Sequence, residues 1–493
     1  MQQVLRPAGS VDSYPVDVFQ VQTKEELICA LEHLRRTKKR FIPIGAQRSF
    51  GQHFVPVEGA VGLDVSSLER NVEVLEEGED GSLWVRAGAG IRFIDLRQQF
   101  PEHRVLHPPT TDTITLGGAF AACVHNMSGY FASGIRAFEL VLPTGEEVFC
   151  SAEVEGVGAE LFSIVPGAMG ALGVVCSFEL LLQPVARDTT WHVHSLYAGP
   201  VMADEFYRAV ESGFESEKFA EGCGAFMYGN RGWGAVVADE QLPLGSPRQG
   251  GQAPLTDDKL DQQAFAQGIA NRFPRVAEWI VRKSYSMGAK RWAPWYGAQF
   301  FQRGYDRAFD VCSRSGLKYG LARAFGVDGR LPIMHQAWFF PREQLRNFMK
   351  TYFEVLDQFP DIESRAEQQD LVLLQPCAYP AHSMGQTSFD LAVVTSSFTI
   401  PGSARKLRPQ IEEFYRRVSA FSLEKVPGTR VSLCKQVHAD SHVLKAMHAP
   451  WIELIGGWKK RLDPEDLLCS RHLEDLFGSE GVPEQSIVGD DAL

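Results

Sequence analysis

The chain has 493 residues, more than one domain usually holds, so two domains are the first expectation. Hydrophobic residues make up 44% and charged residues 22%, a globular composition that can bury a large core without disulfide or metal support. The formal net charge of -12 argues against nucleic-acid or anionic-membrane partners, because phosphate groups attract basic surfaces.

The cysteines and the first residues of the chain bear on its compartment. The 9 cysteines are odd in number and scattered, and no CxxC occurs, which predicts a reducing compartment without a disulfide framework. The start of the chain lacks the apolar core of a signal peptide, and no apolar run approaches the length of a membrane span. We therefore expect a cytoplasmic protein.

The first predicted elements are a strand, a helix and a second strand. VFQVQ alternates between apolar and polar residues, as a half-buried strand does. Thr23 and Glu26 have the spacing of a capping box, and apolar residues at helical spacing follow over 27–34. FIPIG, residues 41–45, is a short apolar strand that runs into a glycine turn.

Further strands and short helices are predicted as far as Pro184. Strand-like runs lie at 61–65, 83–90 and 137–146, a helix lies near 91–99, and residues 160–184 form a short helix, a glycine-rich turn and a strand. The elements lack a strict strand–helix rhythm, which indicates an α+β fold rather than a doubly wound sheet. No GxGxxG follows the first strand, so the dinucleotide-binding fingerprint of that other fold is missing.

The character of the sequence changes after residue 185. Residues 186–434 are richer in aromatic residues, and the polar stretch 240–256 predicts a mobile surface loop. Residues 440–475 have the pattern of amphipathic helices.

Three loops rich in glycine and small residues lie within the first 175 residues. The first is PIGAQRSFG, residues 43–51, in which Gly45 allows a tight turn that can direct successive backbone N–H groups toward one anion, such as a pyrophosphate. The second lies within 108–129, and the third, PGAMGALGVV, spans 166–175. Three such loops predict a long ligand that is contacted along its length.

The order of these motifs resembles a known family. PxGxxRSxG, a strand ending in LD, VxAGAG, PxTxxxTLGGA, PTGE and GxxGxV are similar to the FAD domain of the vanillyl-alcohol oxidase / p-cresol methylhydroxylase (PCMH) superfamily. Within it, the pattern is most similar to the decaprenylphosphoryl-ribose oxidase and sugar-lactone oxidase branch. LCKQVHADS at 433–441 and LLCSRHLEDLF at 467–477 resemble that branch's return to the FAD domain, and HQAWFFP at 335–341 looks like a substrate-domain strand.

The resemblance implies a two-domain PCMH-type FAD-binding fold of the α+β class. Residues 1–185 would form the FAD domain, and 435–493 would return to it. Residues 186–434 would form a substrate-binding cap domain, an antiparallel sheet with helices.

The resemblance also assigns flavin contacts to the three loops. The first loop would hold the pyrophosphate through backbone N–H groups, the second would line the flavin or its phosphoribityl arm, and the third would touch FAD through its backbone. The cofactor-binding residues implied are Gly45, Ala46, Gln47, Arg48, Ser49, Thr110, Thr115, Gly117, Gly118, Cys123, His125 and Val175.

The sequence departs from the family pattern around the flavin. Arg48 stands where covalent members carry a histidine that bonds the flavin, so we expect non-covalent FAD. Cys123 and His125 are the alternative attachment points. The branch often has Tyr where Phe50 stands and an aromatic residue where Ser432 stands, so the sugar substrate of the branch does not transfer directly.

Two residues are candidates for catalysis. Lys435 stands where the branch has a lysine near the pyrimidine edge of the flavin, and a cation there would stabilise the negative charge of the reduced ring. His335 and Gln336 lie on an alternating strand, and His335 is the candidate for substrate contact or general base. Either His335 or Lys435 would take the proton, and oxygen or another acceptor would reoxidise the flavin.

Other readings of the sequence remain open. His438, His442 and His448 lie near helical spacing, but no fourth-ligand pattern accompanies them, so we expect no metal site. The aromatic residues between 292 and 305 would either pack in the core or line an apolar substrate.

The function expected is an FAD-dependent oxidoreductase that oxidises a small organic substrate by hydride transfer to flavin N5. One alternative is an FAD-dependent biosynthetic enzyme for oxidative cyclisation or desaturation. Others are a non-catalytic FAD-binding protein and a glycine-rich protein without flavin.

Overall fold

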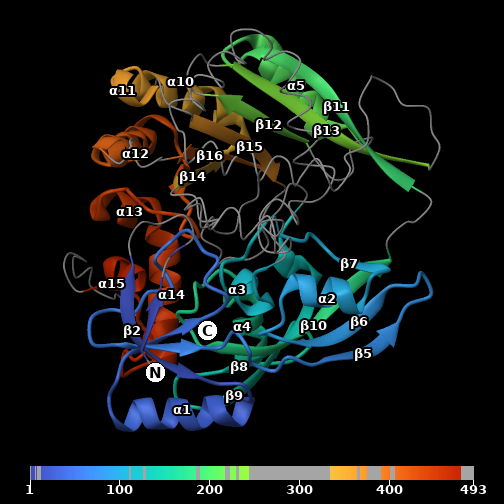
Figure 1. Ribbon diagram of the computed structural model, residues 1–493, viewed down its shortest axis with the longest axis vertical. Coiled ribbons are helices and arrows are strands. Elements are labelled where there is room, and N and C mark those ends of the chain that lie inside the picture. Colours follow the sequence, from blue (N-terminus) through green and yellow to red (C-terminus); the bar gives the residue numbers. More distant parts are fainter. Residues whose placement is uncertain are drawn as a thin grey trace, which may run out of the picture.

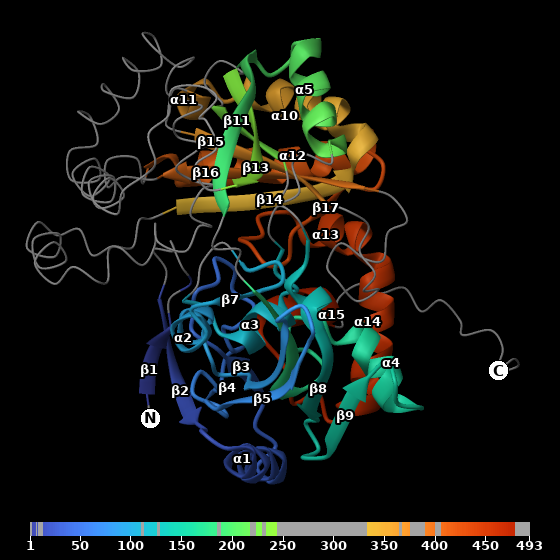
Figure 2. The ribbon, with the colours of Figure 1, turned by 90° about the vertical axis from the view of Figure 1, so that its right-hand side faces the viewer.

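The computed structural model describes residues 2–5, 7, 13–109, 113–125, 129–184, 189–216, 223–228, 233–243, 333–363, 367–374, 390–399 and 406–478. These residues form two halves stacked along the longest axis (Figure 1). The lower half holds two sheets and the upper half holds one. Helices α13 (Ser441–Met447) and α14 (Ala449–Leu462) run down one side from the upper half to the lower (Figure 2).

The first sheet of the lower half is small and mixed. Its order is β1 (Gln2–Leu5), β2 (Tyr14–Gln20), β4 (Val61–Asp64) and β3 (Phe41–Ile44), with β4 parallel to both β2 and β3. Helix α1 (Lys24–Arg36) connects β2 to β3. Thr23 caps this helix as predicted, since its side chain accepts from the N–H of Glu26 at 3.2 Å, and the Glu26 carboxylate accepts from Gln22 at 2.8 Å.

The second sheet is antiparallel and carries the second and third of the predicted glycine loops at its connections. Its order is β5 (Val72–Glu77), β6 (Leu83–Gly88), β10 (Val174–Pro184), β8 (Ile135–Val141) and β9 (Glu147–Ser151), and β7 (His103–Val105) also pairs with β10. The helices between its strands are α2 (Phe93–Gln99), α3 (Leu116–Ala121), the 3-10 turn Phe131–Gly134 and α4 (Val157–Ile164). Strand β5 escaped prediction because its sequence, VEVLEE, is an edge strand in which no residue is fully buried.

The upper half is built on a seven-stranded antiparallel sheet. Its order is β11 (Thr189–Pro200), β13 (Trp233–Pro243), β12 (Cys223–Tyr228), β15 (Glu367–Leu374), β16 (Leu391–Thr399), β14 (Ile333–Pro341) and β17 (Arg430–Val431). Its helices are α5 (Asp204–Glu215), the 3-10 turn Arg342–Gln344, α10 (Leu345–Leu356), α11 (Pro360–Glu363) and α12 (Arg408–Lys425). The α+β class and the antiparallel sheet are confirmed, whereas the domain boundaries stay a prediction.

The prediction of a surface loop at 240–256 is wrong for its first four residues. Residues 240–243 continue β13, where they pair with the start of β11, so backbone hydrogen bonding extends the strand through the polar residues. The rest of that stretch, and the aromatic segment between 292 and 305, lie outside the described residues.

Strand β14 presents alternate residues to opposite faces. Trp338 packs against Tyr352 of α10 and Tyr415 of α12, with ring centroids 6.0 and 5.7 Å apart. The side-chain amide of Gln336 donates to Ser419 of α12 at 3.0 Å. Because strand residues alternate, His335, Ala337 and Phe339 lie on the other face, away from these helices.

The carboxy-terminal segment returns to the lower half. The N–H of Phe41 donates to the carbonyl of Leu467 at 2.7 Å, and Cys469 N–H donates to the carbonyl of Phe41 at 2.9 Å. Helix α15 (Arg471–Phe477) follows. The segment 467–469 thus lies beside β3 like an added strand.

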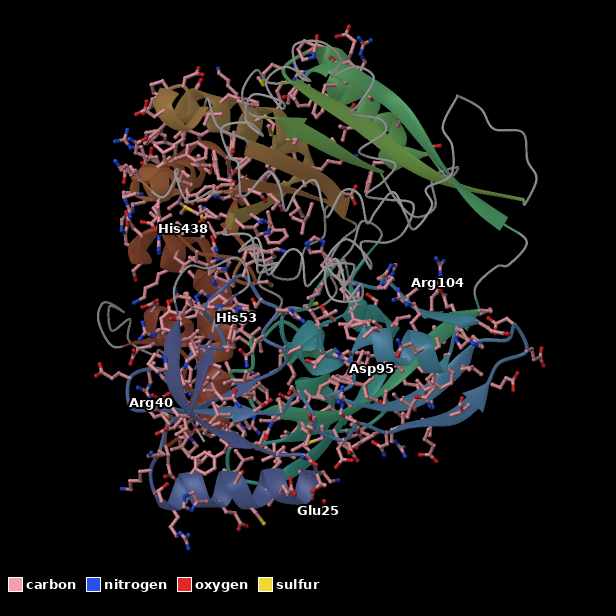
Figure 3. The ribbon with its side chains drawn as sticks, in the orientation of Figure 1. Glu25, Arg40, His53, Asp95, Arg104 and His438 are labelled. Carbon is pink, nitrogen blue, oxygen red and sulfur yellow. The ribbon has the colours of Figure 1, made fainter. Side chains whose placement is uncertain are left out.

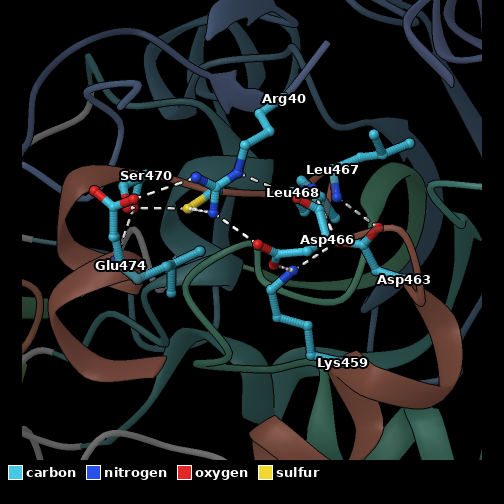
Figure 4. A network of polar contacts seen from close by, with 10 residues as sticks. Arg40, Lys459, Asp463, Asp466, Leu467, Leu468, Ser470 and Glu474 are labelled. Carbon is cyan, nitrogen blue, oxygen red and sulfur yellow. Dashed lines mark hydrogen bonds and ion pairs between the residues drawn. The ribbon is translucent and has the colours of Figure 1, made fainter. Parts of the chain in front are cut away.

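A buried ion pair holds the turn that makes this return (Figure 4). Lys459 Nζ lies 2.6 Å from Asp463, and the two side chains are only 8% and 1% exposed. Asp463 also accepts from the N–H groups of Leu467 at 2.9 Å and Leu468 at 2.8 Å. Arg40, at the start of β3, reaches Asp466 of the same turn at 2.7 Å.

Replacing Asp463 by alanine should lower the free energy of unfolding by about 2–4 kcal/mol. The substitution leaves the N–H groups of Leu467 and Leu468 without their acceptor and removes one of the two carboxylates that pair with the buried Lys459, the other being Asp466 at 2.7 Å. Urea unfolding of the full chain measures the effect. Glu465→Ala is the matched control, since Glu465 pairs with Arg35 at the surface, with side chains 39% and 51% exposed, and should cost less than about 1 kcal/mol. Equal losses in the two variants would contradict the structural role of Asp463.

Candidate active site

The first glycine loop leaves β3 in a conformation suited to an anion. Gln47 has φ 55°, in the left-handed region, and follows the small residues Gly45 and Ala46. Such a turn directs neighbouring N–H groups to one side. A Cβ on Gly45 would lie 2.8 Å from Oγ1 of Thr115, so a side chain at this position would collide with the second loop. The first and second loops are therefore in contact, as the ligand-binding hypothesis requires.

The second loop leads into the short helix α3. Thr115 caps it, and its Oγ1 accepts from the N–H of Gly118 at 3.3 Å. Gly117 donates its N–H to the carbonyl of Ala89 at 2.9 Å, and a Cβ on Gly117 would approach Ala89 Cβ to 3.1 Å. The small residues thus allow helix α3 to pack in direct contact with the AGAG turn, residues 87–90, at the end of β6.

The third loop contacts the other end of the same helix. Gly167 N–H donates to the carbonyl of Phe120 at 3.2 Å, and Met169 N–H donates to that of Ala121 at 2.9 Å. Val175 lies half-buried on β10, opposite Leu140. All three predicted loops therefore meet around α3.

The carboxy-terminal return also reaches these loops. Cys434 Sγ donates to the carbonyl of Ala122 at 3.0 Å, and Ser49 Oγ donates to the carbonyl of Cys434 at 3.3 Å. A Cβ on Gly51 would lie 2.5 Å from the carbonyl oxygen of Lys435. Lys435 is therefore beside the first loop, although nearly four hundred residues separate them in the chain.

Gly51→Ala should weaken FAD retention, because the new methyl group must push the backbone of Lys435 away from the first loop. Overpacking of this kind costs about 1–3 kcal/mol. The flavin content of the purified variant measures the effect. Gly457→Ala is the control, because Gly457 lies in α14 with nothing within 4 Å of its added Cβ. Full flavin content in Gly51→Ala would contradict the close packing.

The two catalytic candidates both lie beside Phe50. The ring centroids of Phe50 and His335 are 4.6 Å apart, and Lys435 Nζ lies 5.5 Å from the centroid of the Phe50 ring. Burial, and secondly the positive charge of Lys435, hold the pKa of His335 well below its ordinary value. The imidazole is thus neutral at neutral pH.

The remaining residues predicted to contact the flavin differ in their exposure to solvent. Arg48 is exposed, and Cys123 is 1% exposed with φ 42°. The His125 ring lies 5.9 Å from that of Phe339 on β14, where the two halves of the molecule meet. Thr110 lies outside the described residues.

The three histidines weighed as a metal site have separate environments. His438 stacks on Tyr415 with ring centroids 5.3 Å apart, and His448 is buried with Nε2 2.8 Å from the carbonyl of Val431. His442 is exposed on α13. Within the described ranges, no group of three or more His, Cys, Asp or Glu side chains could hold a metal ion.

Sequence reasoning missed a second group of histidines behind the first loop. His53 lies near the level where the two halves meet (Figure 3), with Nδ1 3.4 Å from Ser49 Oγ. Burial, together with the nearby His472, lowers the pKa of His53 to about 3, and burial lowers the pKa of His472 to about 4. No local signal marks this pair, because His472 comes from α15 at the far end of the chain.

His472 should make stability depend on pH. Its pKa is lowered to about 4 in the folded state, so between pH about 6.5 and 4 the unfolded chain binds a proton that the folded chain does not. Stability is lost as the pH falls through this window, at up to about 1.4 kcal/mol per pH unit. Denaturant unfolding at several pH values should show a shallower slope for His472→Gln. Parallel curves for variant and wild type would contradict the assignment.

Comparisons with known proteins agree with this geometry. Residues 15–151 match the FAD binding domain family. Residues 15–151 are an FAD-binding domain. It is of the vanillyl-alcohol oxidase / p-cresol methylhydroxylase type, and FAD is its cofactor. The loops fit this group, since Gln47 adopts the conformation of an anion-binding turn and the glycines let the three loops pack closely together.

The relatives are similar over part of their length only. The chain is 29% identical to cytokinin dehydrogenase 3 of Oryza sativa subsp. japonica over 30% of this chain and 28% of that protein. It is 25% identical to the mitochondrial D-lactate dehydrogenase [cytochrome] of Arabidopsis thaliana over 34% of this chain and 30% of that protein. The aligned part of the chain thus spans less than a third of the curated relatives it matches.

The fold similarity extends over the whole chain. The crystal structure of cholesterol oxidase from B. sterolicum has a TM-score of 0.65 to this chain and covers 97% of both chains at 13% identity. This confirms the PCMH-type fold with its antiparallel cap sheet, while the sugar-oxidase branch stays a prediction. Among the described residues, no helix has both the length and the apolar character needed to cross a membrane.

Proposed function

We propose that the protein is an FAD-dependent oxidoreductase that oxidises a small organic substrate at a carbinol carbon or a related C–H donor. The observation that carries this proposal is the position of His335, Phe50 and Lys435 at the junction between the FAD domain and the cap sheet. When bound, FAD supplies the hydride acceptor, N5 of its ring system. The protein must then bind and orient the substrate and remove a proton from it.

Three groups of residues would hold the cofactor. The first loop, 45–49, would take the pyrophosphate through its N–H groups. The second loop, with Thr115, Gly117 and Gly118, and the third loop before Val175 would take the remainder by close backbone contact. Two observations support this division: Gly45 has no room for a side chain against Thr115, and both later loops bond to α3.

His335 is better suited than Lys435 to accept the proton. A neutral imidazole carries a lone pair, whereas a protonated lysine has no acceptor. Burial and Lys435 together lower the pKa of His335, which keeps that lone pair available at neutral pH. Lys435 would instead act as a fixed positive charge that stabilises negative charge developing on the cofactor.

FAD is proposed to be held without a covalent bond, because Arg48 stands where covalent members have a histidine. The purified protein should show flavin absorption bands, and acid precipitation should release the colour into the supernatant. Colour retained in the pellet would direct attention to Cys123 and His125. A colourless protein that also fails to bind added FAD would contradict the FAD assignment itself.

His335→Gln should slow flavin reduction by about 10²–10⁴-fold, the usual contribution of a general base. Lys435→Met should slow the same step by removing the positive charge. Anaerobic stopped-flow reduction by a panel of alcohols, hydroxy acids and amines measures the rates, and reoxidation by oxygen or by a dye then identifies the acceptor.

His442→Gln, on the exposed face of α13, is the control and should leave the rates unchanged. A flavin that dithionite bleaches but no organic donor reduces would favour a non-catalytic FAD-binding protein.

A further inference from the structure

His335 is fixed in place by two residues that come from distant parts of the chain. Its backbone N–H donates to Oε1 of Gln436 at 2.8 Å, and the N–H of Gln436 donates back to its carbonyl at 3.2 Å. Its ring Nδ1 lies 2.7 Å from Oγ of Ser397, the residue opposite it on β16. Backbone and ring are therefore both restrained.

The other ring nitrogen is left without a partner. Nε2 of His335 is buried and has no hydrogen-bond partner within the part of the chain that the structure describes. The whole residue is 9% exposed. Buried polar atoms are nearly always hydrogen-bonded, so an unpartnered one beside a cofactor domain indicates a ligand contact.

The bond to Ser397 determines what Nε2 can do. If Ser397 accepts from Nδ1–H, Nε2 carries the lone pair and can accept a proton or a hydrogen bond. If Ser397 donates to Nδ1, Nε2 carries the hydrogen and can only donate. A serine hydroxyl permits both arrangements, so the pair can take whichever tautomer the reaction needs.

We propose that Ser397 is a positioning residue that accepts a hydrogen bond from Nδ1–H of His335 and so presents the Nε2 lone pair to the substrate. This inference rests on the proposed function. The O–H or N–H bond of the substrate breaks, its proton forms an N–H bond at Nε2, and the Nδ1–H bond to Ser397 stabilises the resulting imidazolium. Gln436 fixes the backbone of His335 through two hydrogen bonds and links it to the segment that carries Lys435.

The first test needs no substrate. In the FAD-loaded full chain labelled with ¹⁵N-histidine, the ring nitrogen shifts report the tautomer, and His335→Gln assigns the signal. The wild type should carry the proton on Nδ1, and Ser397→Ala should move it partly or wholly to Nε2. Ser397→Thr keeps the hydroxyl and should restore the wild-type signal. A proton on Nε2 in the wild type, or an unchanged tautomer in Ser397→Ala, would overturn the proposal.

Ser396→Ala is the matched control for a purely structural effect. Ser396 is the neighbouring buried hydroxyl on β16, and it bonds Tyr352 at 2.8 Å on the helix side of the sheet. This variant also removes a buried hydrogen bond, but it should leave the His335 signal where it is in the wild type. An equal shift of the His335 ring nitrogen signals in both serine variants would indicate a general loss of packing in the sheet and would reject the positioning role of Ser397.

Flavin reduction by an active donor supplies the second readout. Ser397→Ala should lower the limiting rate about 10–100-fold, as expected for losing one hydrogen bond to a group that becomes charged, with little change in donor affinity. Ser397→Thr should recover most of that rate. If no donor reduces the wild type, the proposed function fails while the tautomer spectrum still decides the role of Ser397.

Discussion

The close approach of four chain segments to the short helix α3 is the constraint on which the rest of the site depends. The first loop meets its N-cap at Thr115, the AGAG turn meets it at Gly117, and the third loop and the return bond to carbonyls at its other end. Backbones can approach this closely only where side chains are absent or short. The small residues that predicted a ligand-binding region are thus also the residues that allow the loops to assemble.

The carboxy-terminal segment connects the two halves of the molecule through the same place. It pairs with β14 at residues 430–431, touches the first loop and His335 at 434–436, and lies beside β3 at 467–469. The cap sheet, the catalytic candidates and the lower half are therefore all contacted by one continuous segment, residues 430–469. The buried Lys459–Asp463 pair and the hydrogen bond from Leu467 N–H to Asp463 stabilise the final turn of this segment.

The electrostatics of the junction follow from burial. His335, His53 and His472 are kept neutral mainly because desolvation penalises the imidazolium form, and Lys435 adds to this effect at His335. A neutral, restrained imidazole beside a lysine can accept a proton at neutral pH without first losing one.

The sequence by itself determined many of the local elements and the positions of the three glycine loops. The Thr23 cap, the strand into Gly45 and the order of the glycine loops depend on residues a few positions apart, and their spacing is visible in one dimension. It did not reveal β5, whose polar edge lacks a buried face, or the strand through residues 240–243. Only the tertiary structure decided that Ser397 faces His335, that Lys435 lies beside Gly51 and that His472 lies near His53. These contacts join residues from separate strands and helices, and strand pairing and packing, rather than local spacing, bring them together.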